Sequence, residues 1–257
     1  MKNDYQSKKA FFDRMITIYG RKPVLEALND NEIPIYRLHL ADSNKGGGVI
    51  TEMLNIANKR GIEVVYHSKQ ELSRISRNSK QDQGVAADIK SNMYDNYQSL
   101  FELPAHQTEL IALDGITNPQ NLGMIIRSVC ASGMHGILLP EKGCCEINPL
   151  VIKASVGTLF KTRIYRCKEL DKSLQELQDH GWQTCVMSSH AKQDISDFIV
   201  DKPTIYIMGN ETEGVSKSIM NHANKQLMIP MSNGVESLNV AVTASLIAFR
   251  GHFQRDR

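Results

Sequence analysis

The feature that most constrains the fold of this chain is an alternation of short apolar runs with helical stretches from residue 109 onward. Six runs have the length and composition of β-strands: LIALD (110–114), GILLP (136–140), TRIYR (162–166), QTCVMS (183–188), TIYIMG (204–209) and QLMIP (226–230). Helical stretches lie between most of them, and a long one follows the last run. Continuously apolar strands need cover on both faces of their sheet, which is typical of a parallel sheet in an α/β fold. Residues 109–257 are therefore predicted to form one parallel-sheet domain.

The front of the chain shows a second, smaller α/β pattern. Strand-like runs alternate with the helical stretches KPVLEALND (22–30), GGVITEMLNIANKRG (47–61) and KQELSRIS (69–76). Residues 1–90 are therefore predicted to form a small domain of their own. Residues 91–108 are polar, contain a proline and show no clear period, so they are predicted to be a linker.

Composition supports a globular protein of two domains. The chain has 257 residues, of which 41% are hydrophobic and 23% charged. No apolar run reaches the ~18–20 residues that span a bilayer, and a cytoplasmic protein is expected. The five cysteines include no CxxC pair, so they are interpreted as reduced thiols. The eight histidines form no HExxH motif, which argues against a zinc site, and no metal is expected.

Positive charge is concentrated in the front domain. Residues 1–90 carry 15 Lys and Arg against 11 Asp and Glu, whereas residues 91–257 carry 15 against 17. Arg60, Arg74 and Arg77 belong to a basic cluster between residues 59 and 80, which suits an RNA phosphate backbone. The alternative interpretation is an ordinary solvated face.

Polar residues and glycines are densest directly after three of the predicted strands. The segments are DGITNPQN (114–121), GNETEG (209–214) and MSNGVESLN (231–239). Ligands of open α/β sheets bind beyond the carboxyl ends of the strands, so these loops are the predicted site. Neither GxGxxG, GxxxxGK[ST] nor GxSxG occurs, which disfavours a nucleotide-dependent oxidoreductase, a P-loop enzyme and an α/β-hydrolase.

Each loop also has a purely structural interpretation. Asn118 or Asn121 could cap the helix that follows the first loop, and Ser237 or Asn239 the helix that follows the third. Acidic residues in the second loop suit a helix N-terminus. Arg127 lies in a helix that looks apolar nearly all round, so it is expected either to pair with a carboxylate such as Asp114 or Glu211, or to face an anionic oxygen.

Three segments resemble, in order and spacing, the motifs of the SpoU/TrmH (SPOUT) family of RNA ribose 2′-O-methyltransferases. They are DGITNPQNLGMIIRSVCASG (114–133), MGNETEGV (208–215) and IPMSNGVESLNVAVTAS (229–245). The front domain is similar to the L7Ae/L30e-like substrate-binding domain of many members. The chain is most similar to the RlmB-like subgroup, which methylates a guanosine of 23S ribosomal RNA.

The resemblance implies a catalytic domain with a deep trefoil knot, S-adenosylmethionine as methyl donor, a homodimer and RNA as substrate. It implies catalytic roles for Asn121, Arg127, Glu211, Ser237 and Asn239. The donor would be bound by another set, namely Gly209, Ile229, Met231 and Leu238.

The sequence departs from the family pattern at two positions. Asn118 stands where the family commonly has Asp, and Glu236 stands where it has a small or neutral residue. Two alternatives stay open: a transfer RNA methyltransferase of the same family, and a non-catalytic RNA-binding protein of ribosome assembly.

Overall fold

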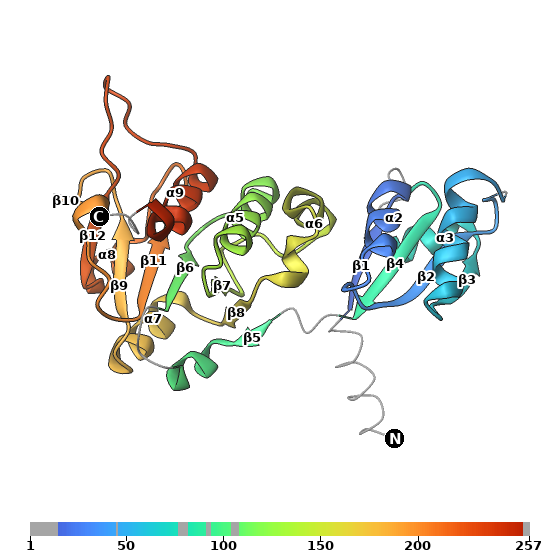
Figure 1. Cartoon of the computed structure of the whole chain (residues 1–257), viewed down its shortest axis with the longest axis horizontal. Helices are drawn as coiled ribbons and strands as arrows, with labels where there is room; N and C mark the ends of the chain where they lie inside the picture. Colours follow the sequence, from blue (N-terminus) through green and yellow to red (C-terminus); the bar gives the residue numbers. More distant parts are fainter. Residues whose placement is uncertain (1–14, 45, 77–81, 91–93, 104–107, 254–257) are drawn as a thin grey trace. The chain divides into compact units, whose positions relative to one another are not determined.

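The computed structural model describes residues 15–44, 46–76, 82–90, 94–103 and 108–253 (Figure 1). The chain divides into two compact units, Met1–Met93 and Tyr94–Arg257. Each unit has its own sheet and its own core, which confirms the predicted fold class of two α/β parts.

The N-terminal unit contains a four-stranded mixed sheet in the order β1-β4-β2-β3. Its strands are β1 (Met15–Tyr19), β2 (Ile35–Ala41), β3 (Glu63–His67) and β4 (Val85–Lys90). Strand β4 is antiparallel to both β1 and β2, and β2 is parallel to β3. The helices are α2 (Arg21–Asn29), α3 (Gly48–Lys59) and α4 (Lys69–Ser76). In α3 the buried residues Ile50, Met53 and Ala57 recur at helical spacing, which explains why this stretch packs as a helix.

The C-terminal unit contains an eight-stranded, all-parallel sheet in the order β10-β12-β9-β11-β6-β7-β8-β5. Its strands are β5 (Asp95–Asn96), β6 (Glu109–Leu113), β7 (Gly136–Pro140), β8 (Ile164–Cys167), β9 (Gln183–Met187), β10 (Gln193–Asp194), β11 (Thr204–Met208) and β12 (Lys225–Met228). The six predicted strands are all present. The two additional strands, β5 and β10, are edge strands of two residues, too short to show a period in the sequence.

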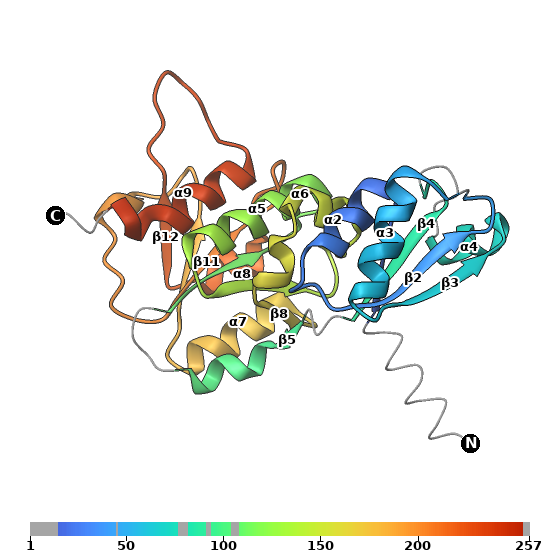
Figure 2. The ribbon, with the colours of Figure 1, turned by 45° about the vertical axis from the view of Figure 1, so that its right-hand side comes forward.

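Helices cover both faces of this sheet (Figures 1 and 2). One face carries α5 (Pro119–Ser132), α6 (Pro149–Ser155) and α9 (Val240–Phe253), with the short η2 (Thr158–Lys161). The other carries η1 (Tyr97–Glu102), α7 (Leu170–Asp179) and α8 (Lys217–His222). The short η3 (Ile195–Asp197) follows β10. Both views show segment 229–239 reaching away from the sheet before α9 begins.

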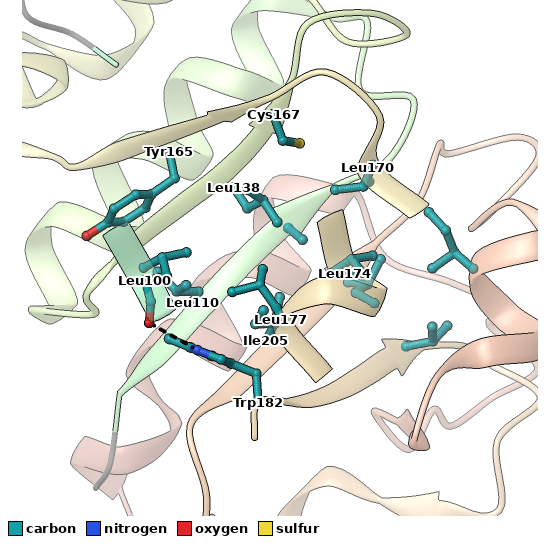
Figure 3. Close-up of a cluster of buried hydrophobic side chains, with 14 of the residues drawn as sticks. Leu100, Leu110, Leu138, Tyr165, Cys167, Leu170, Leu174, Leu177, Trp182 and Ile205 are labelled. Atoms are coloured by element: carbon teal, nitrogen blue, oxygen red, sulfur yellow. Dashed lines mark hydrogen bonds between the residues drawn. The ribbon is translucent and has the colours of Figure 1, made fainter. Parts of the chain in front are cut away.

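Residues 94–103 were predicted within the linker, but the structure places them in the C-terminal unit. Strand β5 pairs with β8, and Leu100 of η1 is fully buried in the core beneath α7 (Figure 3). The indole Nε1 of Trp182 donates to the Leu100 carbonyl oxygen over 3.3 Å. Burying such a leucine is worth roughly 1.5–3 kcal/mol. The sequence around Leu100 gives no signal for this contact, because a two-residue strand and a short 3₁₀ turn are too short to show a hydrophobic period.

The strand order reverses beside β6. From β6 the chain adds β7 and β8 on one side, then crosses the sheet to place β9, β11 and β12 on the other. The loops after β6 and β11 are therefore neighbours, and β9 lies between β11 and β12. Such a reversal is where ligands bind in open α/β sheets. The trefoil knot implied by the resemblance stays a prediction, because strand order alone does not test it.

Candidate active site

A cavity of about 370 Å³ lies at the carboxyl edge of β9, β11 and β12. Its walls come from four parts of the chain: residues 187–190 after β9, residues 208–215 and Met220 around the loop after β11, the segment 229–238 in part, and the first turn of α9. The second and third predicted loops therefore meet at one cavity.

The four residues predicted to bind the methyl donor, Gly209, Ile229, Met231 and Leu238, all line this cavity. Gly209 is required by sterics. A Cβ atom at this position would lie 2.1 Å from the Gly214 carbonyl carbon and 2.1 Å from the Val215 nitrogen. The turn after β11 can close on itself only because residue 209 has no side chain.

Three predicted catalytic side chains form one hydrogen-bonded group. Asn121 of α5 donates from Nδ2 to Glu211 Oε1 over 2.6 Å, and Asn239 donates from Nδ2 to the same oxygen over 2.9 Å. Asn239 Nδ2 also lies 3.2 Å from Asn121 Oδ1. Asn121 is only 5% exposed. We refer to this group as the Asn121–Glu211–Asn239 triad. Its residues come from the first turn of α5, the loop after β11 and the start of α9, and they are up to 118 positions apart in the sequence.

Helix capping and site formation occur together. Asn118 Oδ1 accepts from the Gln120 N–H over 2.8 Å and caps α5, which leaves Asn121 free for the triad. Asn239 does both, because its Oδ1 accepts from the Ala241 N–H over 2.9 Å at the start of α9 while its Nδ2 faces Glu211. Asn239 therefore both caps the helix and belongs to the triad, which are the two roles considered for the third loop. Ser237 lines the cavity as well.

Arg127 lies on an exposed stripe of α5, together with Met124, which is 41% exposed. The prediction that this helix is apolar nearly all round is therefore wrong for the stripe that α6 and α9 leave uncovered. Among the described residues Arg127 has no ion pair with Asp114 or Glu211. Asp114 Oδ2 instead accepts from the Ser216 N–H over 2.7 Å, and Glu211 is held by the two amides.

Sequence reasoning missed one wall of the cavity, residues Met187, Ser188, Ser189 and His190. They lie at the site because β9 is inserted between β11 and β12, and this strand order cannot be read from periodicity. The available signal was the polar segment SSH (188–190), which begins at the last residue of the fourth predicted strand.

The three arginines predicted to bind RNA have different surroundings. Arg60 donates from its guanidinium to the carbonyl oxygens of Leu28 and Ile33, each over 2.6 Å. These bonds hold the end of α2 and the segment that follows it in place. Arg74 is exposed on the last turn of α4. Arg77 lies outside the described residues. Their role in RNA binding stays a prediction.

The cysteines are all free, as predicted. Burial raises the pKa of Cys167 to about 11 and that of Cys185 to about 12, so both thiols are protonated at neutral pH and react poorly. Burial also raises the pKa values of Cys144 and Cys145. No helix within the described ranges is long and apolar enough to span a membrane.

The described residues thus combine a parallel sheet that has a cavity at its carboxyl edge with a separate, smaller α/β unit. The model described as "SpoU rRNA Methylase family" matches residues 109–249, more than half of the chain. A second model, described as "RNA 2'-O ribose methyltransferase substrate binding", matches residues 17–95. The chain therefore belongs to the SpoU family of RNA 2′-O-ribose methyltransferases.

Relatives and solved structures agree with this assignment. A protein of Mycolicibacterium gilvum named "Uncharacterized tRNA/rRNA methyltransferase" is 30% identical over 90% of this chain and 74% of its own length. The SpoU methyltransferase AviRb of Streptomyces viridochromogenes, solved with AdoMet, has a TM-score of 0.73 at 23% identity over 97% of this chain and 93% of its own. An AdoMet-bound rRNA methyltransferase of Sinorhizobium meliloti has a TM-score of 0.70 at 22% identity over 97% and 91%. The likeness to these two structures establishes the fold.

Proposed function

We propose that this enzyme uses S-adenosylmethionine to methylate the 2′-hydroxyl of a guanosine in large-subunit (23S) ribosomal RNA. The observation that carries the proposal is the triad, which lies beside the cavity formed by the second and third motif loops. The volume of that cavity falls within the ~300–1,000 Å³ of sites for small molecules. Its apolar wall residues Ile229, Met231 and Leu238 suit the adenosyl part of the donor.

When bound, the donor would supply an electrophilic methyl group on a sulfonium. The sulfur is a good leaving group because it departs as a neutral thioether. The residues of the chain must align the ribose oxygen with that group, and alignment can supply roughly 7–11 kcal/mol. Arg127 is assigned to the oxyanion that develops on the ribose and to the adjacent phosphate, because a guanidinium stays protonated in proteins and is a poor base. Glu211 accepts from two amides and thereby orients Asn121 and Asn239 toward the nucleotide.

We further propose a homodimer built on α5 and α9. These helices lie side by side, joined by a 2.8 Å hydrogen bond between Ser128 and Ser245. Beside it Met124, Val242 and Leu246 are 41%, 48% and 43% exposed, so the two helices present an apolar stripe. A second copy seated there would bring Arg127 to the subunit interface. Light scattering of Leu246→Glu should give a monomer, and an unchanged dimer would exclude this face.

The test of function is transfer of labelled methyl groups from S-adenosylmethionine to unmodified 23S ribosomal RNA and, in parallel, to bulk transfer RNA. Label in ribosomal RNA only, and its loss in Arg127→Ala, would support enzyme class and substrate together. Label in transfer RNA would support the methyltransferase activity but would contradict ribosomal RNA as the substrate. Donor binding without label in either RNA would favour a non-catalytic RNA-binding protein or a precursor particle as substrate.

The planar guanidinium itself is tested by Arg127→Lys. A lysine keeps the charge but not the fork that contacts two oxygens at once. Retention of the full rate would contradict the role assigned to Arg127. Charge reversal at Arg74 and Arg77 should weaken RNA binding in a gel-shift assay without changing donor affinity.

A further inference from the structure

A second cavity, of about 430 Å³, lies on the other side of the turn after β11. Its walls come from the ends of β6, β7 and β11 and from the start of α8. It shares Asn210, Glu213, Gly214 and Val215 with the cavity proposed to bind the methyl donor, which we call the donor cavity, so the two cavities are separated only by this turn. It also lies where the strand order reverses beside β6, the place at which open α/β sheets bind ligands.

The walls of the second cavity are fixed by hydrogen bonds within the chain. Asn210 donates from Nδ2 to the Gly115 carbonyl oxygen over 2.9 Å, and its Oδ1 accepts from the Thr212 N–H over 2.8 Å. The Cys145 N–H donates to the Ile116 carbonyl oxygen over 2.7 Å, which ties the loop after β7 to the loop after β6. The amide nitrogen and the amide oxygen of Asn210 are therefore both hydrogen-bonded within the chain. The wall that they form does not depend on a bound ligand.

The residues that line this cavity include two carboxylates and one cation. The carboxylate of Glu213 is exposed, and within the described residues it has no hydrogen bond or ion pair. Asp114 uses one carboxylate oxygen for the Ser216 N–H and keeps the other. Lys217 is the cation among the lining residues. A ligand of this cavity should therefore present hydrogen-bond donors to a carboxylate and an anionic group to a lysine.

We infer that the second cavity receives a guanine base of the substrate RNA, with Glu213 accepting from its N1–H and N2–H groups. Guanine is the RNA base that presents two adjacent donors on its Watson–Crick edge, and a carboxylate accepts two donors at once. Adenine would turn its N1 acceptor toward the same carboxylate. Lys217 contacts the phosphate of that nucleotide. Unstacked bases of single-stranded RNA are recognised on this edge. The inference rests on the proposed function, and it names the residue that selects the base.

The experiment uses the full chain with saturating S-adenosylhomocysteine, so that the donor cavity is filled. Binding of GMP, IMP and AMP is measured by ligand-observed NMR titration. GMP should bind about tenfold or more tightly than AMP, and IMP, which lacks the N2 amine, should lie between them. In Glu213→Gln, measured with S-adenosylhomocysteine still saturating, the affinity for GMP should fall to that for AMP.

Asp201→Asn is the matched control. Asp201 is an exposed carboxylate that precedes β11, at the opposite edge of the sheet. This variant should keep the preference for GMP. Equal affinities for GMP and AMP, no binding of GMP, or an unchanged preference in Glu213→Gln would each overturn the inference.

Methyl transfer to RNA is followed in parallel on the same protein preparations without S-adenosylhomocysteine, to separate this inference from the function. Transfer by the unaltered chain without any GMP preference would remove the base-selecting role and leave the methyltransferase intact. Loss of both donor binding and transfer would instead reject the proposed function.

Discussion

Asn239 performs two tasks with the two ends of one amide. Its oxygen caps α9 and its nitrogen holds the carboxylate of Glu211. The sequence places a capping residue here for local reasons, but the contact to Glu211 depends on the approach of a loop that is 28 positions earlier in the chain. Local pattern therefore predicted the cap and the motif, whereas the partner became visible only in the folded chain.

Substitution of Asn239 by serine separates the two tasks. Serine is as good an N-cap as asparagine but cannot reach and hold Glu211 as the amide does. In Asn239→Ser the free energy of unfolding should change by less than about 0.5 kcal/mol, and methyl transfer should fall at least about tenfold. Asn239→Ala should lose the cap too, at a cost of ~1 kcal/mol. Urea denaturation and single-turnover rates measure both; a full rate for the serine variant would show that the amide is dispensable.

At the scale of elements, the crossing of α5 and α6 depends on one missing side chain. A Cβ atom on Gly123 would lie 2.4 Å from the Ala154 Cβ and 2.7 Å from the Val151 carbonyl oxygen. The two helices can approach this closely only at a glycine. Helix α5 also carries Asn121, so the same contact positions the triad.

Gly123→Ala is therefore expected to separate the two helices. We expect a loss of roughly 1–3 kcal/mol in the free energy of unfolding, as for other overpacked sites, together with weaker methyl transfer. Gly251→Ala is the matched control, since Gly251 also lies in a helix but a Cβ there would meet nothing within 4 Å. That variant should be unchanged or up to about 1 kcal/mol more stable. Equal effects of the two substitutions on thermal and urea unfolding would contradict the packing argument.

The N-terminal sheet contains a hydrogen-bonded row with one residue from each strand. Thr17 Oγ1 donates to Asp88 Oδ1 over 2.6 Å, Asp88 Oδ2 lies 3.0 Å from His39 Nε2, and His39 Nδ1 lies 2.9 Å from His67 Nε2. Burial and the neighbouring His39 lower the pKa of His67 below its ordinary 6.5. Burial tends to raise the pKa of Asp88, but hydrogen bonds from His39 and Thr17 outweigh it and leave the pKa below 3.8.

These pKa shifts predict that the N-terminal unit loses stability on acidification. Below pH 6.5 the unfolded chain binds a proton at His67 before the folded chain does, so unfolding is favoured. The contribution of Asp88 is present above pH 3.8 and is lost only below that value. Between pH 7.5 and 5.5 the melting temperature should therefore fall, and His67→Gln should flatten that fall. An equally steep decline in the variant would assign the effect to another group.

At the scale of the whole molecule, each of the two units has its own core. The row of histidines belongs to the N-terminal unit, and the donor cavity belongs to the C-terminal one. The sequence predicted both units, all six long strands and the three loops, because periodicity and glycine-rich breaks are local signals. It did not predict residues 94–103 as part of the C-terminal core, the wall from residues 187–190, or the exposed stripe around Arg127. Each of these depends on strand order or helix packing between distant segments.

Calorimetry of the full chain should resolve this division. S-adenosylmethionine at 100 times its dissociation constant stabilises the unit that binds it by ~2.7 kcal/mol, which raises the melting temperature by roughly 5–10 °C. The shift should affect one transition only, and acidification should move the other. A single transition that responds to both would mean that the units unfold together.

The wall formed by Met187 to His190 contributes to the donor cavity but provides no member of the triad. The segment Met187–His190 is thus separate in sequence from the three residues of the triad, although the loops that carry Glu211 and Asn239 also line this cavity. Random substitutions in the loop after β9 can alter what the cavity accepts while the reacting groups stay in place, because loops vary more freely than the scaffold that carries them. If the proposed function holds, this short segment can be diversified to accept a donor with an altered nucleoside while the triad keeps its sequence.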